Sequence, residues 1–230
     1  MDIANICAKL RKQITGIVDD LPSLRDQADA NDQLARHLID RLLVATDNAT
    51  GCVVLAEHGL GAPLASAARS ILESLFATYW SSQSDEAAAS LLSAMRNEAL
   101  RLMRLNLIKG HAKIRYKKTG ADHTEEILSD SRMAAAGRPP QFRMMAEQSG
   151  LANVYDELYG FKSMFAHGTA TELLANRNQQ RLILANLHSV GVLLNCIHLI
   201  VANRIREHRL TSIAELEAIL RISLAKPKSR

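Results

Sequence analysis

Apolar residues recur three and four positions apart along most of the chain, and no strand-like alternation rises above this pattern. That spacing places the apolar residues on one face of an α-helix. Pro and Gly are scarce, at 5 and 11 of 230 residues, which also disfavours a β fold with many turns. We therefore predict an all-α bundle of about six or seven helices. The expected helices cover residues 3–18, 33–57, 64–80, 84–116, a segment that ends at Gly168, 178–209 and 212–223.

Local signals predict where these helices begin and end. Pro22 is expected to break the first helix. Ser212 and Glu215 have the spacing of a capping box at the start of the last helix. The length, with 47% hydrophobic and 23% charged residues, suits a single domain over residues 1–225 and a disordered tail at 226–230.

The three cysteines are far apart in sequence and form no CxxC pair. This argues against a disulfide framework and against a zinc site, and neither a metal nor a cofactor is expected. The N-terminus lacks the continuous apolar region of a signal peptide. The most apolar stretch, residues 190–203, is too short to span a bilayer. We expect a cytoplasmic protein that does not associate with membranes.

The helix predicted at 64–80 is nearly free of charge. Arg69 and Glu73 are the only charged residues between His58 and Asp85. A helix that is apolar nearly all round is buried nearly all round, so this pair is expected inside the bundle. One interpretation is an ion pair within the helix that fixes its packing. The other is that one of the two side chains reaches a partner on the segment around residues 159–167.

That second segment carries three polar residues four positions apart, namely Tyr159, Ser163 and His167. On an α-helix they share one face and could line a polar seam. Lys162 lies on another side of such a helix and could join the seam only through its long side chain or across a dimer. A buried histidine is more often a hydrogen-bonded core residue than a catalyst, so a structural role stays open.

Positive charge is concentrated in residues 96–118. This segment holds eight Lys or Arg and one acid, Glu98, a net charge of +7 against +4 for the whole chain. Such a surface attracts phosphates, and a solvated surface helix is an equal alternative. A membrane-surface helix is a weaker option, because the leucines of this segment are expected in the core. The candidate nucleic-acid-binding residues are Arg101, Arg104, Lys109, Lys113, Arg115, Lys117 and Lys118. Tyr116 is the only aromatic residue among them, so base stacking has little support.

The combination of Lys162, Ser163 and His167 in an all-α chain resembles the HEPN (higher eukaryotes and prokaryotes nucleotide-binding) superfamily. The hallmark of that superfamily is an Arg and a His with four to six residues between them. Here Lys162 stands in the Arg position, which is a departure, because Lys lacks the two-pronged grip of a guanidinium on phosphate. Arg69, followed by Glu73 and much later by the polar seam, looks more like a bacterial helical family of unknown function near HEPN.

The resemblance implies a metal-independent endoribonuclease that acts as a homodimer, of toxin or phage-defence type. His167 would then transfer protons at the ribose 2′-OH, with Ser163 as an adjacent polar group. Arg69 or Lys162 would stabilise charge on the phosphate, and RNA would be the partner. The alternative is a non-catalytic interaction or ligand-sensing module, in which the same side chains form a structural polar network.

Overall fold

The computed structural model describes residues 2–29, 32–129, 140–160, 162–163 and 179–220. Over these residues the chain forms nine α-helices and one π-helix and contains no strand, which confirms the all-α class. Contacts divide the chain into two compact units, Met1–Asp85 with Phe142–Arg230 and Glu86–Gln141. The predicted single domain over residues 1–225 stays a prediction, since units defined by contacts can belong to one folding domain. The predicted tail, residues 226–230, lies outside the described residues.

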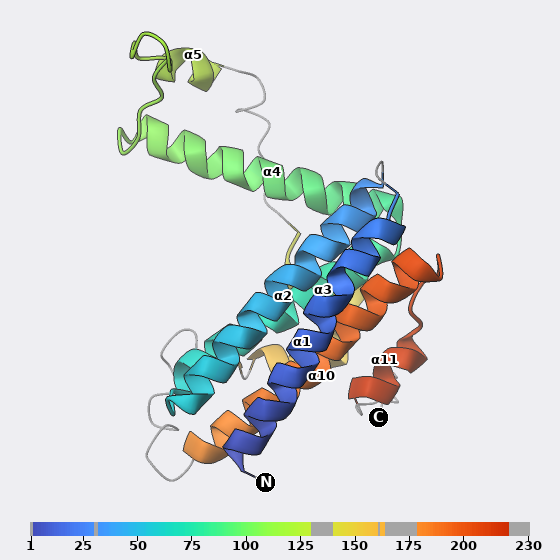
Figure 1. The fold of residues 1–230 in the computed structure, drawn as a ribbon. Helices are drawn as coiled ribbons and strands as arrows, with labels where there is room; N and C mark the ends of the chain where they lie inside the picture. The colour runs from blue at the N-terminus through green and yellow to red at the C-terminus, as the bar shows by residue number, and fades with distance from the viewer. Residues whose placement is uncertain (1, 30–31, 130–139, 161, 164–178, 221–230) are drawn as a thin grey trace, which may run out of the picture. The chain divides into compact units, whose positions relative to one another are not determined.

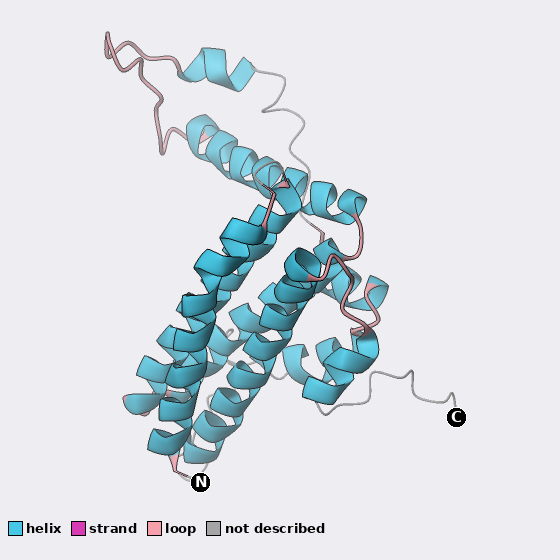
Figure 2. Cartoon of the chain, turned by 45° about the vertical axis from the view of Figure 1, so that its right-hand side comes forward, coloured by secondary structure: helices cyan, strands magenta, loops and turns pink. Residues whose placement is uncertain are grey.

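Four long helices form the first unit and run side by side (Figure 1). They are α1 (Ile3–Gln27), α2 (Gln33–Glu57), α3 (Gly61–Ser82) and α10 (Gln179–Arg206). Helices α1 and α3 each pack against both α2 and α10, and their apolar faces enclose the core. Figure 2 shows the same bundle from a second side.

Shorter helices complete the first unit. Helix α7 (Phe142–Gln148) packs on α3, and α11 (Ile213–Leu220) packs on α10. The three-residue helix α8 (Ala152–Val154) continues into the π-helix η1 (Tyr155–Tyr159). Single π-helical turns are uncommon and are found frequently at functional sites.

Helix α1 does not end near Pro22, so that prediction was wrong. The helix runs on to Gln27 with the proline inside it. Proline lacks an N–H group, which deprives the carbonyl of Val18 of its helical partner. Val18 is 44% exposed, so water can replace that partner. Leu21, just before the proline, and Leu24, just after it, are both buried. Burial of these two leucines offsets the cost of the interrupted ladder.

The second unit contains most of α4 (Asp85–Ile108) and the short helix α5 (Thr124–Ser129). Helix α4 ends eight residues before the predicted end at residue 116. Gly110 has a φ of +71°, and His111 N–H donates to the carbonyl of Asn106. This is the hydrogen-bond pattern with which a glycine in the left-handed region ends a helix. Residues 109–123 therefore form a turn rather than the predicted continuation of the helix.

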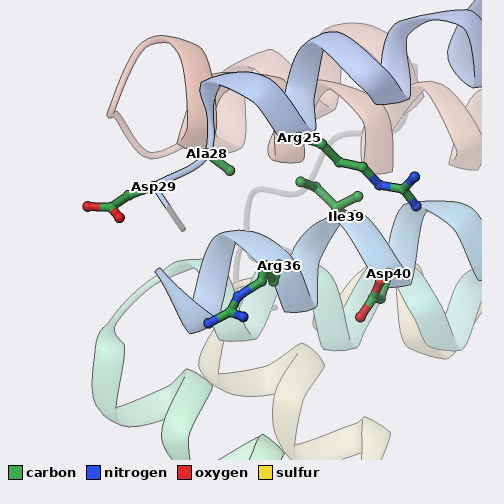
Figure 3. Close-up of a pocket in the computed structure, with 6 residues that line it drawn as sticks. All are labelled: Arg25, Ala28, Asp29, Arg36, Ile39 and Asp40. Carbon is green, nitrogen blue, oxygen red and sulfur yellow. The ribbon is translucent and has the colours of Figure 1, made fainter. Parts of the chain in front are cut away.

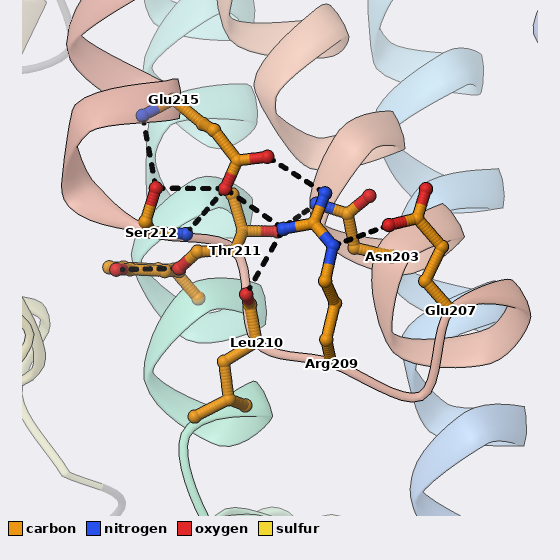
Figure 4. A network of polar contacts seen from close by, with 8 residues as sticks. Asn203, Glu207, Arg209, Leu210, Thr211, Ser212 and Glu215 are labelled. Carbon is orange, nitrogen blue, oxygen red and sulfur yellow. Dashed lines mark hydrogen bonds and ion pairs between the residues drawn. The ribbon is translucent and has the colours of Figure 1, made fainter.

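The predicted capping box at the start of α11 is present. The Glu215 carboxylate accepts from Ser212 N–H at 2.8 Å, and the Ser212 hydroxyl accepts from Glu215 N–H at 3.3 Å. Arg209 binds the same carboxylate from the connection with α10 (Figure 4). Hydrogen bonds from Arg209 and Ser212 hold the pKa of Glu215 at about 2. The carboxylate thus ties the connection to the first turn of α11.

Helix α10 is the one helix of the described chain that is long and apolar enough, by composition, to cross a membrane. Its apolar part is longer than the stretch at residues 190–203 that stands out in the sequence. Half of its most apolar window is buried in the structure, and it packs against α1, α2 and α3. The core helix of a bundle has the same length and composition.

Substituting Gly150 by alanine is expected to destabilise the first unit. Gly150 has a φ of +75°, and a Cβ there would lie 2.6 Å from Cδ1 of Ile213. The left-handed backbone alone costs an alanine about 1–2 kcal/mol. Gly16→Ala is the matched control, because a Cβ at that helical position in α1 meets nothing within 4 Å and should stabilise by about 0.5–1 kcal/mol. Denaturant unfolding of both variants measures the difference, and equal stability would contradict it.

Candidate functional site

Four of the six residues predicted to form a site meet between α3 and the η1 segment. We call Arg69, Glu73, Tyr159 and Ser163 the Arg69 cluster. Arg69 Nε donates to Glu73 Oε1 at 2.9 Å, and Nη2 donates to the Tyr159 hydroxyl at 2.8 Å. Nη1 lies 3.4 Å from the Ser163 hydroxyl, a long hydrogen bond. The expected contact between the Arg69–Glu73 pair and the later segment is therefore present.

The Arg69 cluster closes on itself through Tyr159. The phenol donates to Glu73 Oε1 at 3.1 Å while it accepts from Arg69, so one carboxylate oxygen receives two donors. The Arg69 guanidinium carbon also lies 4.8 Å from the centre of the Tyr159 ring. The ring of Tyr155 stacks on Tyr159 with centroids 4.5 Å apart. The π-helical turn thus presents two stacked rings, one of which holds the arginine.

The cluster is partly open to solvent, since the side chains of Arg69 and Glu73 are each 20% exposed. Burial disfavours the charge on Arg69, but the hydrogen bond and charge of Glu73, supported by Tyr159, outweigh it and raise the pKa. Burial and the Glu73 charge raise the pKa of Tyr159, so it remains a protonated phenol. Chemically, the cluster offers a fixed guanidinium whose charge is already shared with a carboxylate.

Lys162 does not join the Arg69 cluster. Its side chain points to α10, where Nζ donates to Asn186 Oδ1 at 2.7 Å and to the Ser189 hydroxyl at 3.0 Å. Lys162 is only 2% exposed, and burial lowers its pKa to about 8. Cys52 on α2 lies near enough to interact electrostatically with Lys162, but burial raises the pKa of its thiol to about 12 and keeps it neutral. The ammonium is therefore enclosed among neutral groups.

His167, the sixth predicted residue, lies outside the described residues. The predicted helix end at Gly168 does too. Sequence reasoning missed Asn186 and Ser189, the partners of Lys162. The available signal was their spacing of three, on a long helix whose other face is apolar. It also missed the π-helix, for which the sequence carries no signal that we can identify.

The predicted basic residues do not all lie on one helix. Arg101 and Arg104 belong to α4, Lys109 follows its last residue, and the other four lie in the turn that leads to α5. Arg101 donates two hydrogen bonds of 2.6 Å to the Glu98 carboxylate, which offsets much of the positive charge of Arg101. The turn beyond residue 109 therefore carries more free positive charge than the helix.

The leucines of α4 depart from the expected core stripe. Leu102 and Leu105 are 45% and 41% exposed, while Leu107 is buried at 5%. The prediction that they all belong to the core was wrong, because α4 turns its apolar residues to several sides rather than to one stripe.

A cavity of about 330 Å³ lies between the end of α1 and the start of α2 (Figure 3). Its lining includes two arginines and two aspartates, so their charges balance. In Figure 3 the charged ends of Arg36 and Asp29 point away from Ile39 at the centre of the lining. The polar groups do not converge on one point, so we do not treat this cavity as the functional site.

Within the described ranges, no group of three or more His, Cys, Asp or Glu side chains could hold a metal ion. Sequence comparison matches residues 33–181 to a family of unknown function, DUF5677. The match covers most of the chain, including the Arg69 cluster, Lys162 and the basic turn. The protein is thus an all-α protein with a polar site between two helical segments, and it belongs to the DUF5677 family. No curated protein and no solved structure matches the chain. None of these comparisons links it to the HEPN superfamily.

Proposed function

We propose that the protein binds RNA and cleaves it without a metal ion, in the manner that its resemblance to HEPN proteins implies. The observation that supports this most is the contact between Arg69 and the segment that bears His167. Arg69 reaches Tyr159 and Ser163, and His167 follows Ser163 at the spacing of one helical face. The guanidinium of Arg69 and the imidazole of His167 would then both act at the same RNA phosphate.

In this proposal each residue has a separate role. His167 takes the proton of the ribose 2′-OH as that oxygen attacks the neighbouring phosphorus. The bond from phosphorus to the 5′-oxygen breaks, and the leaving oxygen receives a proton from water, which gives a 2′,3′-cyclic phosphate and a 5′-hydroxyl. Arg69 stabilises the charge that builds on the phosphate oxygens. Glu73 and Tyr159 position Arg69.

Arg69, rather than Lys162, fills the arginine role here. Lys162 is 2% exposed and already donates to two side chains of α10, so an RNA phosphate could reach it only if the segment moved. The basic turn after α4 would supply general attraction for the RNA backbone. The HEPN resemblance also implies a homodimer with two such centres.

A second function, a non-catalytic helical module, is favoured by a different observation. The charge of Arg69 is already met by Glu73 at 2.9 Å and by the Tyr159 hydroxyl. A satisfied network of this kind can specify a unique core without performing chemistry. In that case the Arg69 cluster and Lys162 would serve only to hold helices together.

Substitution of His167 separates the two functions. We expect purified wild-type protein to cleave a mixed-sequence RNA in EDTA, and His167→Asn to be at least about 100-fold slower. His188→Asn is the matched control, because His188 is an exposed histidine of α10, and it should cleave like wild type. Expression of the wild type alone should arrest growth if the protein is a toxin.

Absence of RNA cleavage by the wild type would contradict the nuclease. If His167→Asn then also melts at a lower temperature than the wild type, the result would support the structural network.

A further inference from the structure

The turn between α4 and α5 brings together two aromatic rings that are seven residues apart in sequence. Tyr116 and His123 lie against each other in a tilted arrangement, with ring centroids 4.0 Å apart and planes inclined by 38°. His123 is mostly enclosed, with 17% of its side chain exposed, whereas Tyr116 is 44% exposed. The outer surface of this pair is therefore the tyrosine ring.

Hydrogen bonds hold this pair in place. Tyr116 N–H donates to the carbonyl of Ala121 at 2.9 Å, and His123 N–H donates to that of Ile114 at 2.8 Å. The Glu126 carboxylate accepts from the Tyr116 hydroxyl at 2.7 Å and contacts His123 Nδ1 at 2.5 Å. The side-chain hydrogen bond to Glu126 and the two backbone hydrogen bonds thus hold the Tyr116 ring in place, and a fixed ring loses little freedom when a ligand stacks on it.

Positive charge is concentrated on the segment that carries Tyr116. Residues 109–118 contain Lys109, Lys113, Arg115, Lys117 and Lys118 and no acid. Arg115 and Lys117 flank Tyr116 directly. Lys113 and His123 line a cavity of about 860 Å³ in this unit, within the range of about 300–1,000 Å³ typical of sites for small ligands. The same cavity is lined by Asp122, Glu125 and Glu126, whose carboxylates can accept from the amino groups of bases.

From this arrangement we infer that the turn binds single-stranded RNA, with an unpaired base stacked on Tyr116 and the adjoining phosphates on the lysines and Arg115. Aromatic rings among cations are the typical means of binding single strands. A duplex hides the faces of its bases, so it could use only the cations. This inference rests on the proposed function for the identity of the ligand. It adds that the substrate is single-stranded and that recognition is centred on Tyr116.

The test compares two fluorescein-labelled RNAs, a 12-nucleotide single strand and a duplex of the same length, both 2′-O-methylated so that they cannot be cleaved. We expect wild type to bind the single strand at least about tenfold more tightly by fluorescence anisotropy. Tyr116→Leu should lose about tenfold in affinity for the single strand, with duplex affinity and salt dependence unchanged. A 2-aminopurine base in the strand should be quenched by wild type and not by Tyr116→Leu.

Two further variants separate stacking from folding and from charge. Tyr116→Phe loses the hydrogen bond to Glu126 but keeps the ring face, so it should bind within about threefold of wild type. The double variant Lys117→Gln/Lys118→Gln should weaken both RNAs and make the salt dependence shallower, because two phosphate contacts are lost.

Equal wild-type affinity for both RNAs, or unchanged single-strand binding by Tyr116→Leu, overturns this inference and leaves the proposed function standing. Tyr116-dependent binding of the single strand without any cleavage of unmodified RNA removes the nuclease and supports the inference. Failure of wild type to bind either RNA overturns both.

Discussion

Replacing Lys162 with methionine is expected to remove a pH-dependent gain in stability of about 2 kcal/mol between pH 7 and pH 9.5. In the folded protein, burial lowers the pKa of Lys162 from 10.5 to about 8. Between these two values the unfolded chain holds a proton that the folded chain has released, so this group makes folding more favourable as the pH rises. Below pH 8 both states are charged and the full cost of burying the ammonium is present.

The measurement is the difference in unfolding free energy between Lys162→Met and wild type, taken by urea denaturation at both pH values. The cysteines of the unfolded chain also titrate in this range, but they are present in both proteins and cancel in the difference. Lys12→Met, at an exposed position of α1, controls for the loss of a lysine as such. Parallel pH profiles for Lys162→Met and wild type would show that Lys162 is not buried as a cation among neutral partners.

Replacing Arg69 with methionine is expected to cost about 2 kcal/mol at neutral pH. The substitution leaves the Glu73 carboxylate in a mostly buried position with only the Tyr159 hydroxyl as a partner from the cluster. Removing one member of a fully buried pair costs about 3–5 kcal/mol, and the 20% exposure of this pair reduces the cost.

The chain offers a matched control for this prediction in Arg143 and Glu147. They have the same spacing of four residues and the same distance of 2.9 Å from Nε to Oε1, but their side chains are 66% and 53% exposed. Arg143→Met should therefore change stability by less than about 1 kcal/mol. The double variant Arg69→Met/Glu73→Met should recover part of the loss, because no charge is left buried. Equal effects at the two arginines would contradict the role assigned to burial.

The helical class and most helix positions follow from local pattern. The predicted bounds of α2, residues 33–57, match the structure, since the repeat of apolar residues continues without interruption there. The continuation of α1 through Pro22 could not be read locally. This continuation depends on how much apolar surface the last turn of α1 buries against other helices, and that area cannot be calculated from the sequence alone.

The Arg69 cluster was predictable in part. Two charged side chains in an otherwise apolar helix need further hydrogen-bond partners when they are buried. The polar residues at 159 and 163 were the natural candidates for those partners. The direction of Lys162 was not predictable, because its long side chain could reach either side and the choice depends on Asn186 and Ser189 of another helix. The association of Tyr116 with His123 also required the structure, since it depends on the end of α4 at Gly110 and the turn that follows.

By itself, the sequence determined the features that arise from near neighbours, which are the helices, the capping box of α11 and the Arg69–Glu73 pair one turn apart. Helical periodicity and side-chain hydrogen bonds over three or four residues act at short range, so they can be read along the chain. Tertiary structure alone decided that Lys162 is enclosed against α10 and that Tyr116 is backed by His123. The first result depends on desolvation and packing between helices that are distant in sequence, and the second on the path of the turn after Gly110. In both cases the free energy belongs to the assembled neighbours and cannot be assigned to one residue or its periodicity.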